Sequence, residues 1–529
     1  MDSTNTQIKV AVIGAGFGGL AAGIALKREH INDFLIFEEA HDLGGVWREN
    51  TYPGCNCDVP AHLYSLTAQP YHGDVRYPGG ADTLDYLHQV AHDQGLDPHL
   101  RFNTAIASAS FDEDHGGWTL VTATGQIIRA EIVICATGML HRRYLPDIPG
   151  RDDFTGPWFH SAQWDHRQDL TGRRVAVIGT GASAVQLIPE LAATAAQVQV
   201  YQRTPTWVLP KPRARFGRAT RWLLQRIPLA HTVYRAAVYY AADLVLAPIM
   251  TGGWSARPAE FAARAHLFWQ VRDRQLRAAL TPTHPIGAKR ILLSSNYCRA
   301  FGRDNVELIT TPIRSVTATG IRTTDDIIHD ADVIVYATGF TATQFLAPMV
   351  VSGRGGQLLH QHWADGGGTF LGVAVRGFPD WFILAGPNTF NSAGSSIDMK
   401  ERQLHYITAA IRLREQSGAA ALEVSEQATR RYTMWLHAAL ARTVWPTAGC
   451  PSWYKDTAGR ITAPWPSTAR AYARMTRRDP ALDLVPVRVG GQVRRPPRHE
   501  CRLPHPQASN TSAGTPTTAT SSPESRTHP

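Results

Sequence analysis

The sequence predicts an α/β fold with two doubly wound domains and a helical insertion, and three observations carry this prediction. A short apolar strand followed by a glycine-rich turn and an Ala/Leu-rich helix occurs twice, at 8–27 and at 174–192. An apolar strand ending in Ala-Thr-Gly also occurs twice, at 131–138 and at 332–339, and resembles a strand at a domain edge. The length of 529 residues exceeds what one ordinary core needs.

The two glycine-rich turns have the spacing of the GxGxxG pattern. The first glycine of this pattern allows a tight turn, the second lets the backbone approach a pyrophosphate, and the third lets the helix pack closely on the strand. The helix N-terminus attracts the phosphate charge. Both copies therefore predict Rossmann-like nucleotide-binding domains, with these residues in the small positions: Gly14, Gly16 and Gly19 in the first, and Gly179, Gly181 and Ala184 in the second.

The two copies differ in charge at one equivalent position. Glu38 lies 24 residues after Gly14, and Arg203 lies 24 residues after Gly179. An acid at this position accepts hydrogen bonds from a ribose 2′-hydroxyl, whereas an arginine pairs with a 2′-phosphate. This contrast predicts FAD in the first domain and NADPH in the second. Two neighbours, Ser183 and Thr204, are predicted to contact the NADPH as well.

The repeats define the expected domain boundaries. The first domain is expected to be discontinuous, at 1–148 and 330–485, around a second domain at 149–329 that carries a helical insertion at about 205–285. Within the insertion, amphipathic helices are expected at 220–226 and 259–280. The apolar window 236–250 contains Asp243 and is short for a membrane span, so we expect a buried helix there.

Composition excludes several other classes of protein. The net charge is +9, but residues 486–529 hold six Arg and two Glu, and their Pro, Ser and Thr content predicts a disordered tail. The body shows no basic stripe interleaved with aromatic residues, so no nucleic-acid partner is expected. The first residues lack the pattern of a signal peptide. No CxxC pair occurs among the six cysteines, and the Cys55-x-Cys57 pair is interpreted as ordinary thiols in a reducing cytoplasm, without a metal.

A longer motif lies between the two glycine-rich turns. Residues 154–165 read FTGPWFHSAQWD, which matches FxGxxxHxxxW followed by Asp. With the two flanking turns, this resembles the Baeyer–Villiger monooxygenases, class B flavoproteins, over about residues 6–480. The resemblance implies an FAD-containing enzyme that uses NADPH and O2 to oxidise a ketone to an ester or lactone. Flavin-dependent N- and S-oxygenases have a similar motif that usually ends in Tyr or Phe.

The resemblance also implies roles for single residues. Gly45 and Trp47 belong to a family-like run, and Asp58 stands where the family places an active-site aspartate. Lys289 corresponds to a 2′-phosphate contact, and Arg290 to a contact with the oxygenated flavin. Trp453 resembles a late tryptophan that contacts the nicotinamide nucleotide. The stretch 390–396 lacks a histidine that many relatives have, which leaves the local shape of the pocket open.

These residues suit the chemistry that the resemblance implies. A flavin C4a-peroxide must carry negative charge to attack a ketone, and a fixed Arg290 can hold that charge while Asp58 orients it. For His160, in the connection between the domains, a conformational role is favoured over that of a catalytic base. The sequence leaves open an N- or S-oxygenase, a reductase or NADPH oxidase, and a non-catalytic nucleotide-binding protein. It predicts neither the substrate nor the oligomeric state.

Overall fold

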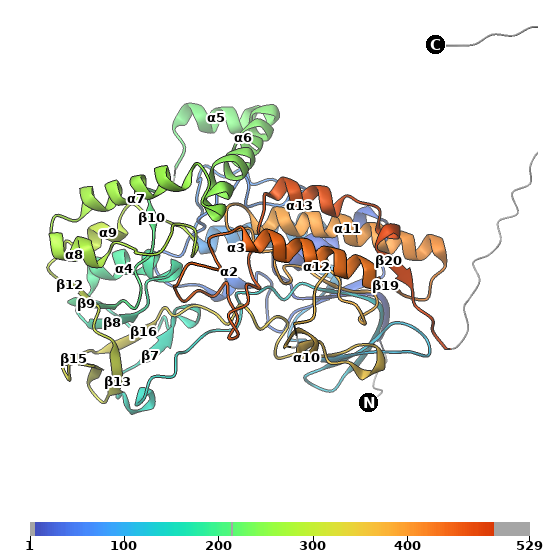
Figure 1. Cartoon of the computed structure of the whole chain (residues 1–529), viewed down its shortest axis with the longest axis horizontal. Coiled ribbons are helices and arrows are strands. Elements are labelled where there is room, and N and C mark those ends of the chain that lie inside the picture. The colour runs from blue at the N-terminus through green and yellow to red at the C-terminus, as the bar shows by residue number, and fades with distance from the viewer. Residues whose placement is uncertain (1–5, 213–214, 365, 491–529) are drawn as a thin grey trace, which may run out of the picture. The chain divides into compact units, whose positions relative to one another are not determined.

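The computed structural model of the chain describes residues 6–212, 215–364 and 366–490 (Figure 1). Most of the residues expected to form a tail lie outside these ranges. The first five of that segment, 486–490, are packed against the body. Val487 and Val489 are buried, and the Val487 amide donates to the Ala421 carbonyl at 2.9 Å. The expected boundary at residue 486 is therefore too early, because two alternating valines suffice to hold this short segment.

The first domain is built on an eight-stranded sheet. Its first strand is parallel to its neighbours on both sides, and the sheet includes segments from both expected parts of the domain. The strand order is β17 (Val350–Ser352), β4 (Ile106–Phe111), β5 (Trp118–Thr122), β6 (Ile127–Cys135), β1 (Thr6–Ile13), β2 (Phe34–Phe37) and β3 (Leu100–Arg101), with β18 (Trp381–Ile383) also pairing β6. Helices of this domain include α1 (Phe17–Arg28), α2 (Val46–Glu49), α3 (Gly80–Asp93), α10 (Leu359–Ala364), α11 (Ser396–Ser417), α12 (Glu426–Ala441) and α13 (Ala469–Thr476).

The second domain has a five-stranded, fully parallel sheet. Its order is β12 (Val306–Ile309), β9 (Gln197–Tyr201), β8 (Arg174–Ile178), β16 (Val333–Tyr336) and β7 (Trp158–His160). Helix α4 (Ala182–Thr194) follows the second glycine-rich turn, and α9 (Tyr297–Ala300) packs beside it. A small antiparallel sheet, β13 (Ile313–Thr317), β14 (Gly320–Thr323) and β15 (Ile328–Asp330), precedes β16. The predicted α/β class with two doubly wound domains is thus confirmed.

The Ala-Thr-Gly strands occupy a different place from the one expected. They are central, because β6 pairs with β1 and β16 pairs with β8. Each ends directly behind a glycine-rich turn. A side-chain carbon on Gly14 would lie 2.8 Å from the Ala136 carbonyl oxygen, and one on Gly179 would lie 2.5 Å from that of Ala337. The backbone φ values of +102° and +117° also favour glycine at these two positions.

The insertion is helical, as predicted, but its apolar part is not buried. It contains α5 (Arg218–Arg226), α6 (Pro228–Ala241), a π-helical turn (Ala242–Leu246), a 3-10 turn (Ala247–Thr251), α7 (Ala256–Gln270) and α8 (Arg274–Ala279). The expected helix at 259–280 is broken, since Asp273 caps α8 by accepting from the Leu276 amide at 2.6 Å. Leu244 is 52% exposed, which contradicts the expected buried helix. Figure 1 shows α5 and α6 rising above the rest of the insertion.

Candidate active site

Arg290 and Asp58, the two residues predicted to act together in the reaction, contact each other directly through their side chains. Arg290 Nε donates to Asp58 Oδ2 at 2.7 Å, and Arg290 Nη2 donates to Asp58 Oδ1 at 2.6 Å. Both side chains are only about one quarter exposed, at 22% and 23%. A two-bond contact of this kind fixes the plane of the guanidinium as well as its position. No residue in the ranges that the structure describes accepts a hydrogen bond from Nη1.

The electrostatic surroundings keep both groups charged. Burial raises the pKa of Asp58, but Arg290 and then Lys211 lower it, and the net change is downward. Burial lowers the pKa of Arg290, but Asp58 raises it, and the net change is upward. Lys211 is anchored beside them, because its ammonium donates to Asn56 Oδ1 and to the Cys57 carbonyl. The site therefore combines one carboxylate with two cations and has an excess of positive charge.

An aromatic wall stands against Arg290. The guanidinium carbon lies 5.3 Å from the ring centre of Phe390, and the Phe390 ring lies 4.9 Å from that of Trp453. The ring centres of Trp453 and Tyr454 lie 4.6 Å apart. The predicted residue Trp453 is thus brought near Arg290 through Phe390, for which the sequence predicted no contact with either residue. The indole of Trp445 ties this wall to the loop before Arg290 by donating to the Gly287 carbonyl at 2.9 Å.

The predicted FAD residues form one continuous backbone surface. The Gly44 amide donates to the Ala15 carbonyl at 3.0 Å, which brings the next residue, Gly45, over the first glycine-rich turn. A side-chain carbon on Gly45 would lie 3.4 Å from the Gly16 α-carbon, an ordinary contact distance that places the two backbone segments side by side. At Gly19 the same carbon would meet the Gly14 carbonyl oxygen at 1.8 Å, so α1 can approach β1 only with glycine there.

Glu38 and Trp47 border this surface. Glu38 is buried, and its carboxylate accepts from the Ala15 amide at 2.8 Å, from the Ala40 amide at 3.1 Å and from Arg48 Nη1 at 3.3 Å. A carboxylate has about four acceptor sites, so these three bonds leave about one for a ribose hydroxyl. The Trp47 indole donates to the Tyr64 hydroxyl at 3.3 Å. The glycine-rich backbone and Glu38 fit the pyrophosphate and the ribose of FAD, respectively.

Two of the predicted NADPH residues, Arg203 and Lys289, lie close enough to interact electrostatically. Arg203 is exposed and Lys289 is half-buried, and neither has a hydrogen bond or ion pair within the described part of the chain. Burial lowers the pKa of Lys289 most, and while the Cys450 thiol opposes this, the charge of Arg203 lowers it further. Two unpaired cations that repel each other fit a 2′-phosphate. A side-chain carbon on Gly181 would meet no atom within 4 Å, which leaves the turn open.

The two smaller predicted contacts lie beside them. The Thr204 carbonyl accepts from Thr180 Oγ1 at 3.0 Å, which fixes the end of β9 against the glycine-rich turn. Ser183 lies in the first turn of α4, half-buried and near the Tyr52 hydroxyl.

Gln186, on α4, connects the two domains beside the site and was missed by the sequence analysis. Its Oε1 accepts from the Tyr52 hydroxyl at 2.8 Å, and its Nε2 donates to the Asn56 carbonyl at 2.9 Å. The segment that leads to Asp58 is therefore held on a helix of the other domain. A neutral glutamine in the middle of a helix gives no sequence signal for this role.

Comparison with known proteins identifies the family. Residues 7–225 match a family model described as flavin-binding monooxygenase-like. The chain is 38% identical to a Baeyer-Villiger monooxygenase of Streptomyces coelicolor, over 92% of this chain and 94% of the relative. The chain belongs to the Baeyer–Villiger monooxygenases. This confirms the predicted family of FAD- and NADPH-dependent monooxygenases.

Solved structures agree with this membership. A steroid monooxygenase bound to NADP superimposes with a TM-score of 0.78 at 30% identity, covering 89% of this chain and 97% of that one. A structure titled OTEMO in complex with FAD and NADP gives a TM-score of 0.81 at 27% identity, covering 92% of this chain and 100% of that one.

In this Baeyer–Villiger monooxygenase, His160 lies at the junction of the domains rather than beside Arg290. It is 1% exposed, its Nδ1 accepts from the Ala162 amide at 3.1 Å, and its Nε2 lies 3.0 Å from the Gly339 carbonyl. The same carbonyl accepts from the Tyr144 amide at 2.8 Å. Burial lowers the pKa of His160 to about 4, although the bond to Gly339 raises it. With both nitrogens bonded and the ring neutral, His160 is placed to hold the interdomain connections together.

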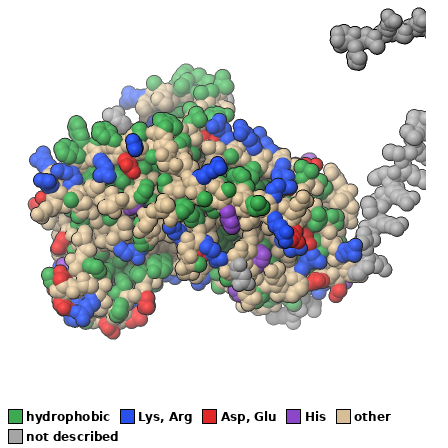
Figure 2. All heavy atoms as spheres, in the orientation of Figure 1, with side chains coloured by type: hydrophobic (Ala, Val, Ile, Leu, Met, Phe, Trp, Pro, Cys, Tyr) green, Lys and Arg blue, Asp and Glu red, His purple; other side chains and the backbone are tan. Residues whose placement is uncertain are grey.

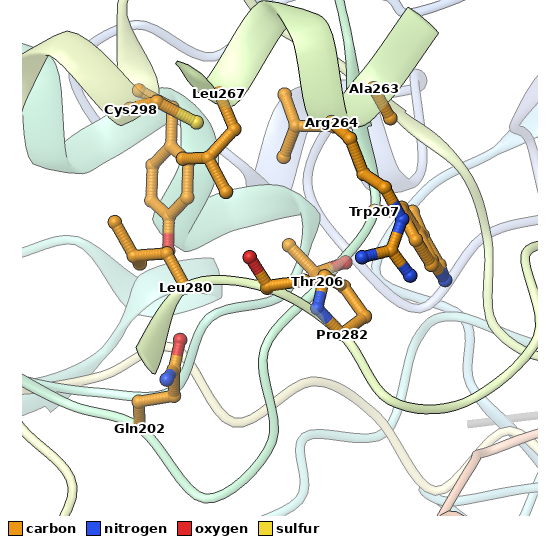
Figure 3. Close-up of a pocket in the computed structure, with 12 residues that line it drawn as sticks. Gln202, Thr206, Trp207, Ala263, Arg264, Leu267, Leu280, Pro282 and Cys298 are labelled. Atoms are coloured by element: carbon orange, nitrogen blue, oxygen red, sulfur yellow. The ribbon is translucent and has the colours of Figure 1, made fainter. Parts of the chain in front are cut away.

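A small cavity lies under α7, close to the NADPH residues in sequence but without them (Figure 3). Its volume is about 20 Å³, enough for about one water molecule and far below that of a substrate. Arg264 lies 5.2 Å from the centre of the Trp207 ring beside it. The cavity lies beside the insertion, and no predicted site residue lines it.

One group of possible metal ligands occurs in the described part of the chain. His141 bonds Glu39 at 2.9 Å and Glu49 at 3.1 Å. The hydrogen bond to Glu39, followed by that to Glu49, raises the pKa of His141 to about 10. Because each ring nitrogen of His141 is bonded to a carboxylate, the three residues form an ion pair network with a protonated histidine, which does not need a metal ion.

Proposed function

We propose that this enzyme oxidises a ketone to an ester or lactone, with NADPH and O2 as co-substrates and FAD as the resident cofactor. The observation that carries the proposal is the guanidinium of Arg290, held by Asp58 through two hydrogen bonds with Nη1 left over. Bound FAD, once reduced by NADPH, would activate O2, of which one oxygen atom goes to the ketone and the other leaves as water. Ketone oxygenation needs negative charge on that oxygen, and a fixed cation in a partly dry site stabilises such charge.

The residues divide into three roles. Arg290 is the catalytic residue, since its unpaired Nη1 can donate to an oxygen that gains charge. Asp58 is a positioning residue, because it contacts Arg290 and fixes its plane. Arg203 and Lys289 hold the 2′-phosphate, which keeps the nicotinamide nucleotide in place and excludes water from the site. His160 is a positioning residue for the interdomain connections.

An N- or S-oxygenase is the alternative. Such an enzyme uses a protonated, electrophilic oxygen and therefore has less use for a fixed cation beside it. The paired Asp58 and Arg290 favour the ketone reaction for this reason. We propose a small-molecule ketone as the substrate and a reducing cytoplasm as the compartment, and the free thiols of Cys55 and Cys57 are consistent with that compartment.

Product analysis separates the two functions. The purified holoenzyme is given NADPH, O2 and a panel of linear, cyclic and polycyclic ketones beside a thioether. We expect ester or lactone from at least one ketone, in proportion to NADPH consumed. Sulfoxide formation with no ester from any ketone of the panel would overturn the proposal in favour of the S-oxygenase.

A further inference from the structure

The hairpin formed by α5 and α6 has an apolar outer surface that no part of the described chain covers. The most exposed side chains are Leu229 at 70%, Trp222 at 59% and Val233 at 58%. Others along the hairpin and the turns that follow it are also exposed: Leu223, Ile227, Tyr240, Leu244, Val245 and Leu246. Figure 2 shows hydrophobic side chains gathered over this region at the top of the view. Single exposed apolar residues are ordinary, but a continuous surface of this kind marks an interaction site.

The exposed apolar residues of α6 share one face of the helix. On α6, Leu229, Val233 and Tyr240 are spaced by four and seven residues and therefore point the same way. The opposite face holds the hairpin to the body. Arg235 Nη1 donates to the His62 carbonyl at 2.8 Å, and the His231 ring lies 4.9 Å from that of His62. The apolar face is thus turned outward by contacts that the inner face makes.

The charges of the hairpin indicate what covers it. Residues 215–242 contain five arginines and no Asp or Glu. Arg215, Arg218 and Arg226 are exposed and have no acidic partner among the described residues. On α5, Arg218, Trp222 and Arg226 follow one another at intervals of four, so cations flank the exposed indole. The outer side of α5 therefore combines one exposed Trp with two arginines that have no acidic partner among the described residues.

We propose that this hairpin docks the enzyme on an anionic lipid surface, with its apolar face in the headgroup boundary and its arginines at the phosphates. Apolar side chains with Trp on one face, accompanied by basic residues, are the composition of helices that lie in a membrane interface. A second copy of the chain fits less well. A symmetric contact would place arginines opposite arginines with no acid to offset them.

The same helix does not cross the membrane. Within the described residues, Leu229–Thr251 is the one stretch long and apolar enough to span, and 17% of its apolar window is buried. Asp243, within this stretch, is 4% exposed and accepts from the Ala469 amide at 2.7 Å and from Arg470 Nε at 3.0 Å. With Arg235 on the inner face, it ties the stretch to the body, so contact is limited to the surface.

The test is flotation of the full-length holoenzyme with vesicles of phosphatidylcholine, with or without phosphatidylglycerol. We expect flotation with the anionic vesicles, weakened by high salt because exposed charges are screened. The triple variant Trp222→Ser, Leu229→Ser, Val233→Ser should bind at least about tenfold more weakly. The double variant Arg218→Gln, Arg226→Gln should bind anionic vesicles about fivefold more weakly for each arginine removed, and its binding to neutral vesicles should not change.

A matched control changes exposed apolar residues elsewhere. Met434 and Leu482 are 75% and 67% exposed, and Met434→Ser with Leu482→Ser should float like the wild type. Flavin absorbance and melting temperature show that each variant is folded. All variants keep residues 491–529, so binding through that segment would survive every change. Failure of the wild type to float, or equal flotation of the wild type and the triple variant, overturns the proposal. A dimer that the triple variant dissociates, without flotation, assigns the surface to a second copy instead.

Discussion

Arg290 and Asp58, 232 positions apart in the chain, meet through two hydrogen bonds of 2.7 and 2.6 Å that fix the guanidinium plane. The pair joins the loop before β11 (Leu292–Leu293) of the NADPH domain to a loop of the FAD domain. A reaction centre that depends on this contact needs both domains in the arrangement that the structure shows. The segments around it are held by Gln186 and Lys211, which also cross between the domains.

Replacing Asp58 by Ala removes the group that orients Arg290. Hydrogen bonds to charged groups contribute about 1.5–3 kcal/mol, so ester formation should fall by about 10- to 150-fold while FAD binding persists. Asp58→Asn keeps an acceptor for one arginine donor and should be less severe. Product per NADPH consumed is the measurement. Wild-type yields from both variants would show that Asp58 does not position Arg290.

Replacing Arg203 or Lys289 by Ala removes a cation proposed to bind the 2′-phosphate. The KM for NADPH should rise by about 10- to 150-fold, and the KM for NADH, which lacks the phosphate, should change little. Arg303→Ala is the control, because Arg303 is exposed in the same domain and has no role in the site. Equal effects on the two nucleotides would remove Arg203 and Lys289 from the phosphate site.

The buried His160 predicts sensitivity to acid. Its pKa is lowered to about 4 by burial, so the unfolded chain binds a proton below about pH 6.5 that the folded chain resists until about pH 4. Stability is fully present above pH 6.5 and is lost as the pH falls between these values, at no more than about 1.4 kcal/mol per pH unit for one group. In the His160→Gln variant, the melting temperature should fall less steeply as the pH is lowered from 6.5 to 4. A residual slope is expected, because burial also lowers the pKa of His62 and His284 to about 4. An unchanged slope would show that His160 is not a source of the acid sensitivity.

Two truncations test where the folded body ends. Removing residues 491–529 should leave FAD content and melting temperature unchanged. Ending the chain after Val485 also removes the buried Val487 and Val489, which contribute about 1.5–3 kcal/mol each as an upper estimate, and should lower the melting temperature. Equal melting temperatures for the two truncations would contradict the packing of these valines.

The sequence predicted those parts of the site that follow a motif. The glycine spacing and the contrast between Glu38 and Arg203 are local patterns with one physical purpose, and the resemblance placed Asp58 and Arg290. Contacts between distant segments gave no such signal. Gln186 and Phe390 are ordinary residue types whose importance comes only from what the fold places beside them.

The prediction of a buried helix at 236–250 was wrong for a related reason. Apolar content shows that a segment avoids water, but not which surface covers it. Here the inner face of α6 is the one that carries His231 and Arg235, while Leu244 and Val245 in the following turn are exposed. The tail boundary was wrong on a smaller scale, because composition averaged over many residues hides a pair of buried valines.

The amount of ester formed per NADPH oxidised by Arg290→Ala tests the central claim most directly. The variant should bind FAD and be reduced by NADPH at rates near those of the wild type, because hydride transfer does not need the guanidinium. Ester or lactone should fall by at least about 100-fold, the scale for loss of a preorganised oxyanion donor, so that NADPH is consumed without oxygenated product. Arg290→Lys should recover little, since an ammonium cannot form the two-bond contact with Asp58. Ester formation by Arg290→Ala at the wild-type rate would contradict the account.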